Sequence, residues 1–199
     1  MNDNIRGYGM KLLEDRIVSE GTILPGDIVK VGSFLNHQID VKLLLEMGKE
    51  VKRLYEGVDI TKIVTVEASG IAIATAFAVS MELPVVFAKK YKTTNVSGDV
   101  LTAEVHSYTH GTSYTMTIES RYINHDDKVL LVDDFLANGE ALRGLRTIIE
   151  KAGAHVAGCA IAIEKGFQHG GDKLREEGLR IDSLAVIDSI ENGRIVFRR

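Results

Sequence analysis

Two adjacent acids, Asp133 and Asp134, stand directly after the four apolar residues Val129 to Val132. A short apolar run that ends in turn residues is typical of a strand buried on both faces. Open α/β sheets bind their ligands at the carboxyl ends of such strands, which is the position of the two acids. Carboxylates accept hydrogen bonds, so a neighbouring pair can hold the two vicinal hydroxyl groups of a ribose ring.

The turn after the acids is suited to a phosphate group. It consists mainly of small residues, contains one glycine and leads into a helical pattern. The first turn of a helix offers free N–H groups and the positive end of the helix dipole, and both favour an anion. Acids for hydroxyl groups beside amides for a phosphate predict a sugar-phosphate site, with the phosphate bound by Ala137, Asn138, Gly139, Glu140 and Ala141.

Three alternatives compete with this interpretation. The simplest is a surface turn after a core strand. The second is the magnesium-binding acid strand of a nucleoside triphosphatase, but that requires a G-x-x-x-x-G-K-[ST] loop, and the sequence contains no such string. The third is an acidic phosphoacceptor pocket, whose acid pair would normally stand near the amino terminus rather than two-thirds along the chain. The sugar-phosphate site is favoured over all three.

The composition limits the other classes of function. The chain has 199 residues, enough for one domain with a full core, and its net charge of -4 gives no support for a nucleic-acid partner. No apolar run is long enough to span a bilayer and the polar start carries no signal region, so no membrane association is expected. The single cysteine, Cys159, cannot form an internal disulfide, which favours the cytoplasm. The histidines lack zinc-site spacing, so no protein-bound metal is predicted.

The elements around the acid motif predict a parallel sheet. Residues 62–66 are expected to form a strand, 71–81 an apolar helix and 84–88 the next strand, and such units favour parallel pairing. Residues 91–118 are polar and threonine-rich with weak alternation, which predicts a long, projecting and mobile hairpin. Periodicity and turn residues predict further helices over 10–18, 40–55, 141–152 and 173–177, and further strands over 156–163, 184–190 and 194–197.

Other polar residues stand at the ends of these strands. Ser69 and Gly70 follow the first strand of the unit, lysines including Lys90 and Lys92 flank the second, and Lys165 ends a later strand. Each has a simpler explanation. Ser69 and Gly70 could form only a tight turn, the lysines at the second strand a solvated charge cluster, and Lys165 could simply reach water. Because parallel strands present their carboxyl ends at one edge of the sheet, the Ser69–Gly70 turn and Lys165 are expected to face the same pocket as the acids.

The segment VLLVDDFLANGEA resembles the phosphoribosyl diphosphate motif of the type I phosphoribosyltransferases, with Asn138-Gly139 in place of the commoner threonine–glycine pair. The resemblance extends over most of the chain. Four further segments resemble, in the expected order, the bacterial members of this family that use xanthine: SFLNHQID (33–40), KIVTVEASGIA (62–72), PVVFAKKYK (84–92) and IAIEKGFQ (161–168).

The resemblance implies a fold and a reaction. The fold is a single α/β domain over residues 1–199, with a mostly parallel twisted sheet flanked by helices, a small hood from about 1–40 plus the C-terminal segment, and a flexible loop at about 91–118. The reaction transfers the 5-phosphoribosyl group from phosphoribosyl diphosphate to N9 of xanthine, giving xanthosine 5′-monophosphate and diphosphate in purine salvage. The family also implies a homodimer, and Mg²⁺ bound mainly through the diphosphate substrate.

The family also implies roles for the donor-binding residues. Asp133 and Asp134 are the implied catalytic acids that hold the ribose hydroxyl groups. The loop of Ser69 and Gly70 is implied to bind the diphosphate through backbone amides and a side-chain hydroxyl. A lysine at the base of the mobile loop, Lys90 or Lys92, is implied to reach the same diphosphate, often from a neighbouring subunit.

The residues implied to bind the base come from two other segments. Lys165 corresponds to a lysine that binds an oxo group of the purine, and Phe167 could stack on the ring, with a core or lid position as the equally weighted alternative. Val29 and Asn36 match hood positions that contact xanthine. The amide of Asn36 offers both a donor and an acceptor to a base that carries oxo and N–H groups.

Two rival functions stay open at this point. The first is the same reaction with guanine, hypoxanthine or adenine as the acceptor, since a few hydrogen bonds separate these purines. The second is a non-catalytic regulator, because the same fold serves as the effector domain of a bacterial purine repressor. A repressor needs a DNA-binding domain, and about 60 residues precede the first core strand, too few for that domain and a hood.

Overall fold

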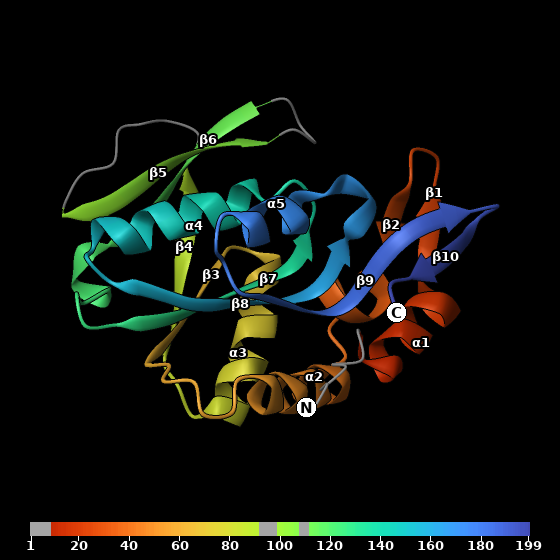
Figure 1. Ribbon diagram of the computed structural model, residues 1–199, viewed down its shortest axis with the longest axis horizontal. Coiled ribbons are helices and arrows are strands. Elements are labelled where there is room, and N and C mark those ends of the chain that lie inside the picture. The colour runs from red at the N-terminus through yellow and green to blue at the C-terminus, as the bar shows by residue number, and fades with distance from the viewer. Residues whose placement is uncertain (1–8, 92–98, 108–111) are drawn as a thin grey trace.

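The computed structural model describes residues 9–91, 99–107 and 112–199 (Figure 1). Its centre is an eight-stranded sheet with the order β10-β9-β8-β7-β3-β4-β6-β5. The five inner strands pair in parallel. These strands are β3 (Lys62–Val66), β4 (Val85–Tyr91), β7 (Lys128–Leu136), β8 (His155–Lys165) and β9 (Ile181–Glu191). The predicted α/β fold with a mostly parallel sheet is confirmed.

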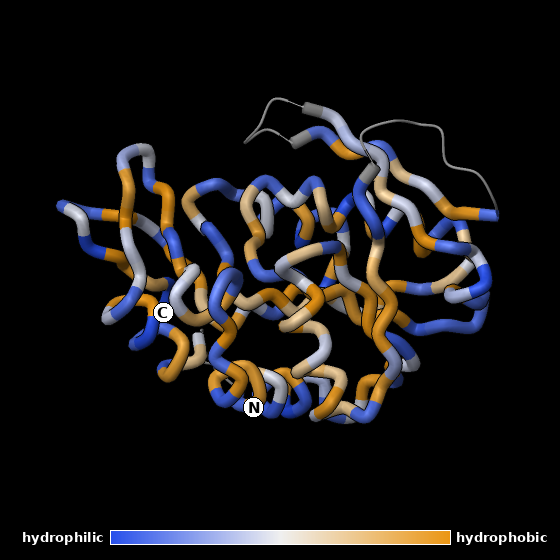
Figure 2. The backbone as a smooth tube through the Cα atoms, turned by 180° about the vertical axis from the view of Figure 1, so that it is seen from behind, coloured by the Kyte–Doolittle hydropathy of each residue, from blue (hydrophilic) through white to orange (hydrophobic). Residues whose placement is uncertain are grey.

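Helices cover both faces of this sheet. Figure 1 shows α2 (Val41–Leu54) and α3 (Ser69–Met81) on one face and α4 (Glu140–Lys151) on the other. Each face has its own core: Leu130 and Val132 of β7 belong to one cluster, and Val129 and Leu131 belong to the other. This alternation explains why β7 is apolar throughout, because both of its faces are buried. In Figure 2 the central strands carry hydrophobic stretches, whereas many outer turns are hydrophilic.

Local signals set the helix ends close to where the sequence predicts them. The Asp40 side chain caps α2 by accepting a hydrogen bond from the Leu43 N–H at 3.1 Å. Gly139 precedes α4 with a φ of 89°, a conformation that favours glycine. The third helix begins at Ser69 rather than at the predicted Ile71, so Ser69 and Gly70 form its first turn.

None of the helices in the described ranges is long and apolar enough to cross a membrane.

The described residues of the predicted amino-terminal hood, 9–40, lie beside β9 and β10 (Arg194–Phe197) (Figure 1). They comprise α1 (Lys11–Glu20), the short strands β1 (Thr22–Leu24) and β2 (Ile28–Lys30), and a π-helical turn η1 (Gly32–Asn36). Polar contacts and core packing join this part to the rest of the chain. The Met10 N–H donates to the Leu184 carbonyl, and Arg199 pairs with the buried Glu14 at 2.8 Å.

The interval predicted as a projecting hairpin is an antiparallel pair, β5 (Val100–Ser107) and β6 (Thr112–Glu119). It differs from the prediction in its attachment, because β6 pairs with β4 and extends the main sheet. Residues 92–98 and 108–111 lie outside the described part, and the mobility of the interval stays a prediction. The backbone groups at the edge of β4 gain partners from β6, which explains why the hairpin joins the sheet.

The remaining short helices connect strands of the main sheet. A 3-10 turn, η2 (Ser120–Tyr122), follows β6. Another, η3 (Gly166–Gln168), follows β8 and leads into α5 (Gly170–Glu176), three residues earlier than the predicted helix at 173–177. The last hairpin turns at Asn192 and Gly193, both with positive φ.

Candidate functional site

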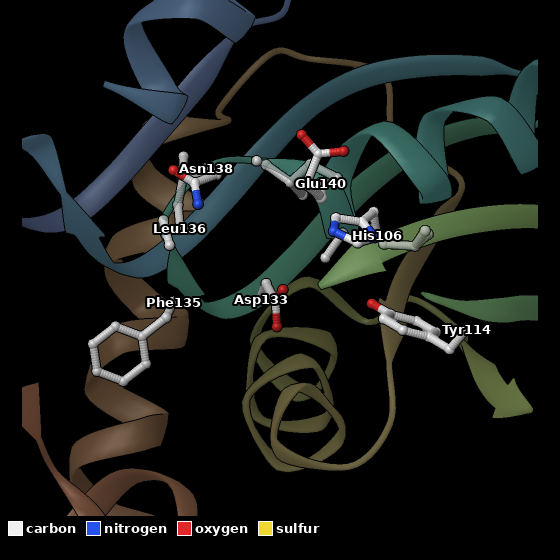
Figure 3. Close-up of a pocket in the computed structure, with 12 residues that line it drawn as sticks. His106, Tyr114, Asp133, Phe135, Leu136, Asn138 and Glu140 are labelled. Carbon is white, nitrogen blue, oxygen red and sulfur yellow. The ribbon is translucent and has the colours of Figure 1, made fainter. Parts of the chain in front are cut away.

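A pocket opens at the carboxyl end of β7 (Figure 3). Asp133 lies at its floor, the turn before α4 forms one wall, and side chains of the β5–β6 hairpin form another. The residues that line it are Val105, His106, Tyr114, Asp133, Phe135, Leu136, Ala137, Asn138, Gly139, Glu140, Ala141 and Leu142. The structure therefore brings the whole predicted phosphate turn and the first of the two acids into one cavity.

Asp133 is held in a buried, electrostatically crowded position. Its side chain is 6% exposed, and Oδ1 accepts a hydrogen bond from the Asp134 N–H at 3.0 Å. Burial raises the pKa of Asp133 well above its ordinary value, and the charge and hydrogen bonding of Asp134 raise it further. The Asp134 N–H and the charge of Lys90 oppose this increase. Asp133 therefore gives up its proton less readily than an ordinary aspartate.

Asp134 faces a different neighbour. Its Oδ2 accepts a hydrogen bond from Asn36 Nδ2 at 2.9 Å, across 98 residues of sequence. Successive side chains of a strand point to opposite faces of the sheet. Asp134 therefore shares with Val132 the face that α2, α3 and the hood cover, called the hood side below, while Asp133 shares the α4 face with Leu131. The acid pair thus lies between the hood and the hairpin, and a predicted base-binding residue touches a predicted ribose-binding residue.

Close packing against α5 shapes the phosphate turn. A Cβ on Gly170 would lie 2.0 Å from the Ala137 carbonyl oxygen, so a larger residue there would displace the turn. A Cβ on Gly139 would similarly meet Leu174 at 2.7 Å. The first N–H groups of α4 have no partner within the helix, as at any helix start. The turn thus combines a fixed backbone with donors that suit a phosphate.

The predicted diphosphate loop reaches the same acids. A Cβ on Gly70 would lie 2.1 Å from Thr65 Oγ1 and 3.4 Å from Asp133 Oδ1, so the start of α3 lies close to Thr65 and to the first acid of the pair. Thr65 Oγ1 is buried and has no hydrogen-bond partner within the described residues. The Glu67–Ala68 peptide bond is cis, and Glu67 Oε1 accepts a hydrogen bond from the Lys90 N–H at 2.5 Å. The loop and the end of β4 are therefore joined.

Of the two lysines predicted to reach the diphosphate, the structure describes Lys90. Lys90 Nζ lies 5.3 Å from the centre of the Tyr114 ring, and its charge lowers the pKa of Asp133. Lys90 thus stands beside the acid pair of its own chain. Lys92 lies outside the described residues.

The predicted base-binding residues lie on the hood side. Lys165 ends β8 and is half-buried, with Nζ 5.6 Å from the centre of the Phe135 ring, and burial lowers its pKa. Phe167 packs against the hood-side core, which agrees with the core alternative, and Val29 is a buried member of that core with 5% exposure. Among these residues Asn36 has the direct hydrogen bond to the acid pair.

Sequence reasoning missed two polar residues that line the pocket, His106 and Tyr114. Tyr114 is half-buried, and Figure 3 shows its hydroxyl group directed toward Asp133. Burial raises the pKa of Tyr114, and the charges of Asp133 and Glu140 raise it further. His106 Nδ1 lies 3.1 Å from Ser113 Oγ on the paired strand. The weak alternation of this interval signalled strands, but nothing local signalled that they pack beside the acids.

The described residues contain no group of three His, Cys, Asp or Glu side chains placed to hold a metal ion. A cation that takes its ligands from a substrate and from water is compatible with this arrangement.

Comparison with known proteins gives consistent matches. The model of the phosphoribosyl transferase domain family matches residues 37–191. Xanthine phosphoribosyltransferase 2 of Clostridium botulinum is 53% identical over 95% of this chain and 100% of its own length. Xanthine phosphoribosyltransferase of Ruminiclostridium cellulolyticum is 50% identical over 94% of this chain and 99% of its own. The solved structure of an adenine phosphoribosyltransferase from Rhodothermus marinus matches with a TM-score of 0.70 at 21% identity. The match covers 89% of this chain and 97% of the other chain and supports the fold.

Proposed function

The chain belongs to the phosphoribosyltransferase family, and we propose that it transfers the 5-phosphoribosyl group of 5-phospho-α-D-ribose 1-diphosphate to N9 of xanthine. The products are xanthosine 5′-monophosphate and diphosphate, so the enzyme serves purine salvage. The observation that carries the proposal is the placement of the acid pair between a phosphate turn and the hood, in a chain that matches named xanthine enzymes over almost its full length.

The proposed chemistry needs no covalent intermediate. N9 of the base forms a bond to C1 of the ribose while the C1–O bond breaks. The electron pair of the broken C1–O bond leaves with the diphosphate. Positive charge builds up on the sugar ring as the bond breaks. The Asp133 and Asp134 carboxylates hold the ribose hydroxyl groups and stabilise this charge, while Ala137 to Ala141 anchor the 5-phosphate.

The leaving group is proposed to bind at the start of α3. Ser69 offers a hydroxyl group. Gly70 carries no side chain at a place where a Cβ would lie 2.1 Å from Thr65 Oγ1 and 3.4 Å from Asp133 Oδ1. Lys90 supplies a positive charge from the adjoining end of β4. Lys92 is proposed for the same role. Closure of the 91–118 hairpin would exclude water, which would otherwise hydrolyse the donor.

The base is proposed to bind under the hood. Lys165 donates a hydrogen bond to an oxo group of xanthine, and its lowered pKa reflects the half-buried position that a base would share. Asn36 meets the polar edge of the base, with Val29 and Phe167 as apolar neighbours of the binding site.

Further proposals concern the metal, the assembly and the location. Mg²⁺ bound to the diphosphate and sugar oxygens would neutralise part of the leaving-group charge. A homodimer is proposed from the family. A cytoplasmic location is proposed from the single cysteine, Cys159, which is buried and whose pKa is raised to about 12 by burial. A thiol in this state is a poor partner for disulfide chemistry.

A base panel tests the proposed function. The purified protein is assayed with phosphoribosyl diphosphate, Mg²⁺ and each of xanthine, guanine, hypoxanthine and adenine, and xanthine is expected to give the highest kcat/KM. Asp134→Asn should abolish turnover and keep the native circular dichroism spectrum. Preference for another purine would assign the enzyme to that base, whereas tight donor binding without diphosphate release for any base would support a regulator instead.

A further inference from the structure

The Asn36 side chain is held in place by the turn that carries it. Phe34 and Leu35 of η1 are fully buried in the hood-side core. The Leu35 N–H donates to the Val31 carbonyl at 3.0 Å, and the Gln38 N–H donates to the Gly32 carbonyl at 2.7 Å. Backbone bonds on both sides of Asn36 and two buried anchors beside it therefore fix the direction of its amide.

This amide ends on a carboxylate that is proposed to work on the other half of the substrate. Asn36 Nδ2 donates to Asp134 Oδ2 at 2.9 Å, and Asp134 is 8% exposed. A hydrogen bond to a charged acceptor in a buried place is among the stronger ones. It therefore restricts the rotation of the Asp134 carboxylate.

Both partners keep capacity for substrate. An amide has two N–H donors and one acceptor oxygen, and a carboxylate has about four lone-pair positions. With one N–H of Asn36 in use, the amide oxygen remains for the base. Asp134 also faces the Asp133 side chain, and its carboxylate keeps lone-pair positions for a ribose hydroxyl. The pair can then lie on either side of the bond that forms between base and sugar.

We infer that Asn36 is a positioning residue for Asp134, which it orients to receive the ribose, so that one hood residue couples the base site to the ribose site. The inference rests on the proposed function and deepens it. It differs from a role in base contact alone, because the effect on the donor side exists before any base is present.

The test measures ribose 5-phosphate affinity by calorimetry with no base in the cell. Asn36→Ala should weaken binding about tenfold, because the carboxylate is no longer oriented. Gln38→Ala, the loss of an exposed amide two residues away on the same hood segment, is the matched control and should bind like the wild type. Equal or tighter binding by Asn36→Ala would overturn the inference.

A double-mutant cycle separates positioning from a general loss of structure. If Asn36 acts through Asp134, Asn36→Ala should weaken binding much less in an Asp134→Asn background than in the wild type, while additive losses would contradict the inference. In Asn36→Asp a third carboxylate would join Asp133 and Asp134, so affinity relative to wild type should recover at lower pH as this group of carboxylates takes up a proton. Absence of that recovery would also count against it.

Failure of the inference differs from failure of the proposed function. If the wild-type protein binds ribose 5-phosphate and transfers it to xanthine, but Asn36→Ala binds ribose 5-phosphate normally, the function stands and the positioning role falls. If the wild-type protein binds neither donor nor ribose 5-phosphate, the proposed function itself is wrong.

Discussion

Asp133 and Asp134 are neighbours in the chain, yet different parts of the molecule control them. Asp134 is oriented by the hood through Asn36, whereas Asp133 shares the α4 side of the sheet with Tyr114 and Lys90. The raised pKa of Tyr114 keeps its hydroxyl group protonated, so it can donate a hydrogen bond. Tyr114 stands across the pocket from the phosphate turn and is placed to reach a bound sugar phosphate.

We predict that Tyr114→Phe raises the KM for phosphoribosyl diphosphate about tenfold, because one hydrogen bond to a charged ligand is lost while the ring remains. The KM for xanthine should stay unchanged. Steady-state kinetics with each substrate varied in turn would measure both values.

Tyr122→Phe is the matched control. Tyr122 is exposed, and its carbonyl oxygen binds Lys62 at the beginning of β3, the opposite end of the strand from the pocket. A donor KM that is equal in wild type and Tyr114→Phe would remove Tyr114 from the site.

The packing of the β5–β6 hairpin on α4 determines where these side chains stand. Gly144 is buried in α4, and a Cβ there would lie 2.5 Å from Val105 Cγ2 and 3.2 Å from Met116 Sδ. Val105 and Met116 are both buried and come from the two strands of the hairpin. The absence of a side chain at Gly144 thus lets the hairpin approach α4 closely enough to form a wall of the pocket.

We predict that Gly144→Ala displaces the hairpin. Overpacking should lower the free energy of unfolding by about 1–3 kcal/mol, in spite of the better helix propensity of alanine. The affinity for ribose 5-phosphate should fall as well. Urea denaturation and calorimetry would measure the two effects.

The compensating variant makes this prediction specific. Val105→Ala removes the atom that a Cβ at position 144 would meet, so the Gly144→Ala/Val105→Ala double variant should bind ribose 5-phosphate better than Gly144→Ala alone. Equal affinity in these two variants would show that the hairpin is not positioned by this contact.

In the molecule as a whole, the polar residues at the carboxyl end of the parallel strands form the pocket, whereas those at the amino end form contacts within the protein. The carboxyl end carries the pocket, whereas the amino end of β3 and β7 carries a buried ion pair between Lys62 and Asp127 at 2.5 Å. Burial alone would raise the pKa of Asp127, but hydrogen bonds from Lys62, the Asn124 N–H and Thr61 together lower it. This cluster joins β3 to the segment that leads into β7.

We predict that this pair makes stability depend on acid pH. A carboxyl group whose pKa is lowered on folding contributes stability above its unfolded pKa, near 3.8, and that contribution is lost as pH falls through the lower folded value. Asp127→Asn should cost about 3 kcal/mol at neutral pH and progressively less below pH 4.

Urea denaturation at a series of pH values would measure this difference. Asp126→Asn, one residue away and highly exposed, should change the free energy of unfolding by less than about 0.5 kcal/mol at every pH. A constant cost of Asp127→Asn over the whole pH range would contradict the assigned cause.

Elements whose signals are local can be predicted from the amino-acid sequence. Strands β3 and β10 begin and end where the hydrophobic pattern predicts, and the apolar strand, acid pair and small turn before α4 are visible in consecutive residues. Local patterns predict such elements because side-chain periodicity and turn residues act over a few positions. The edge rule for parallel sheets then predicted that Gly70 would lie near the acids.

Contacts between side chains that are far apart in the sequence depend on how the elements pack. The hydrogen bond between Asn36 and Asp134 joins residues 98 positions apart, and Tyr114 reaches the pocket because β6 pairs with β4 and Gly144 admits the hairpin. No periodicity records these contacts, since each depends on how two separately formed elements pack. The acid motif therefore predicts a sugar-phosphate site, whereas packing decides which residues orient its two carboxylates.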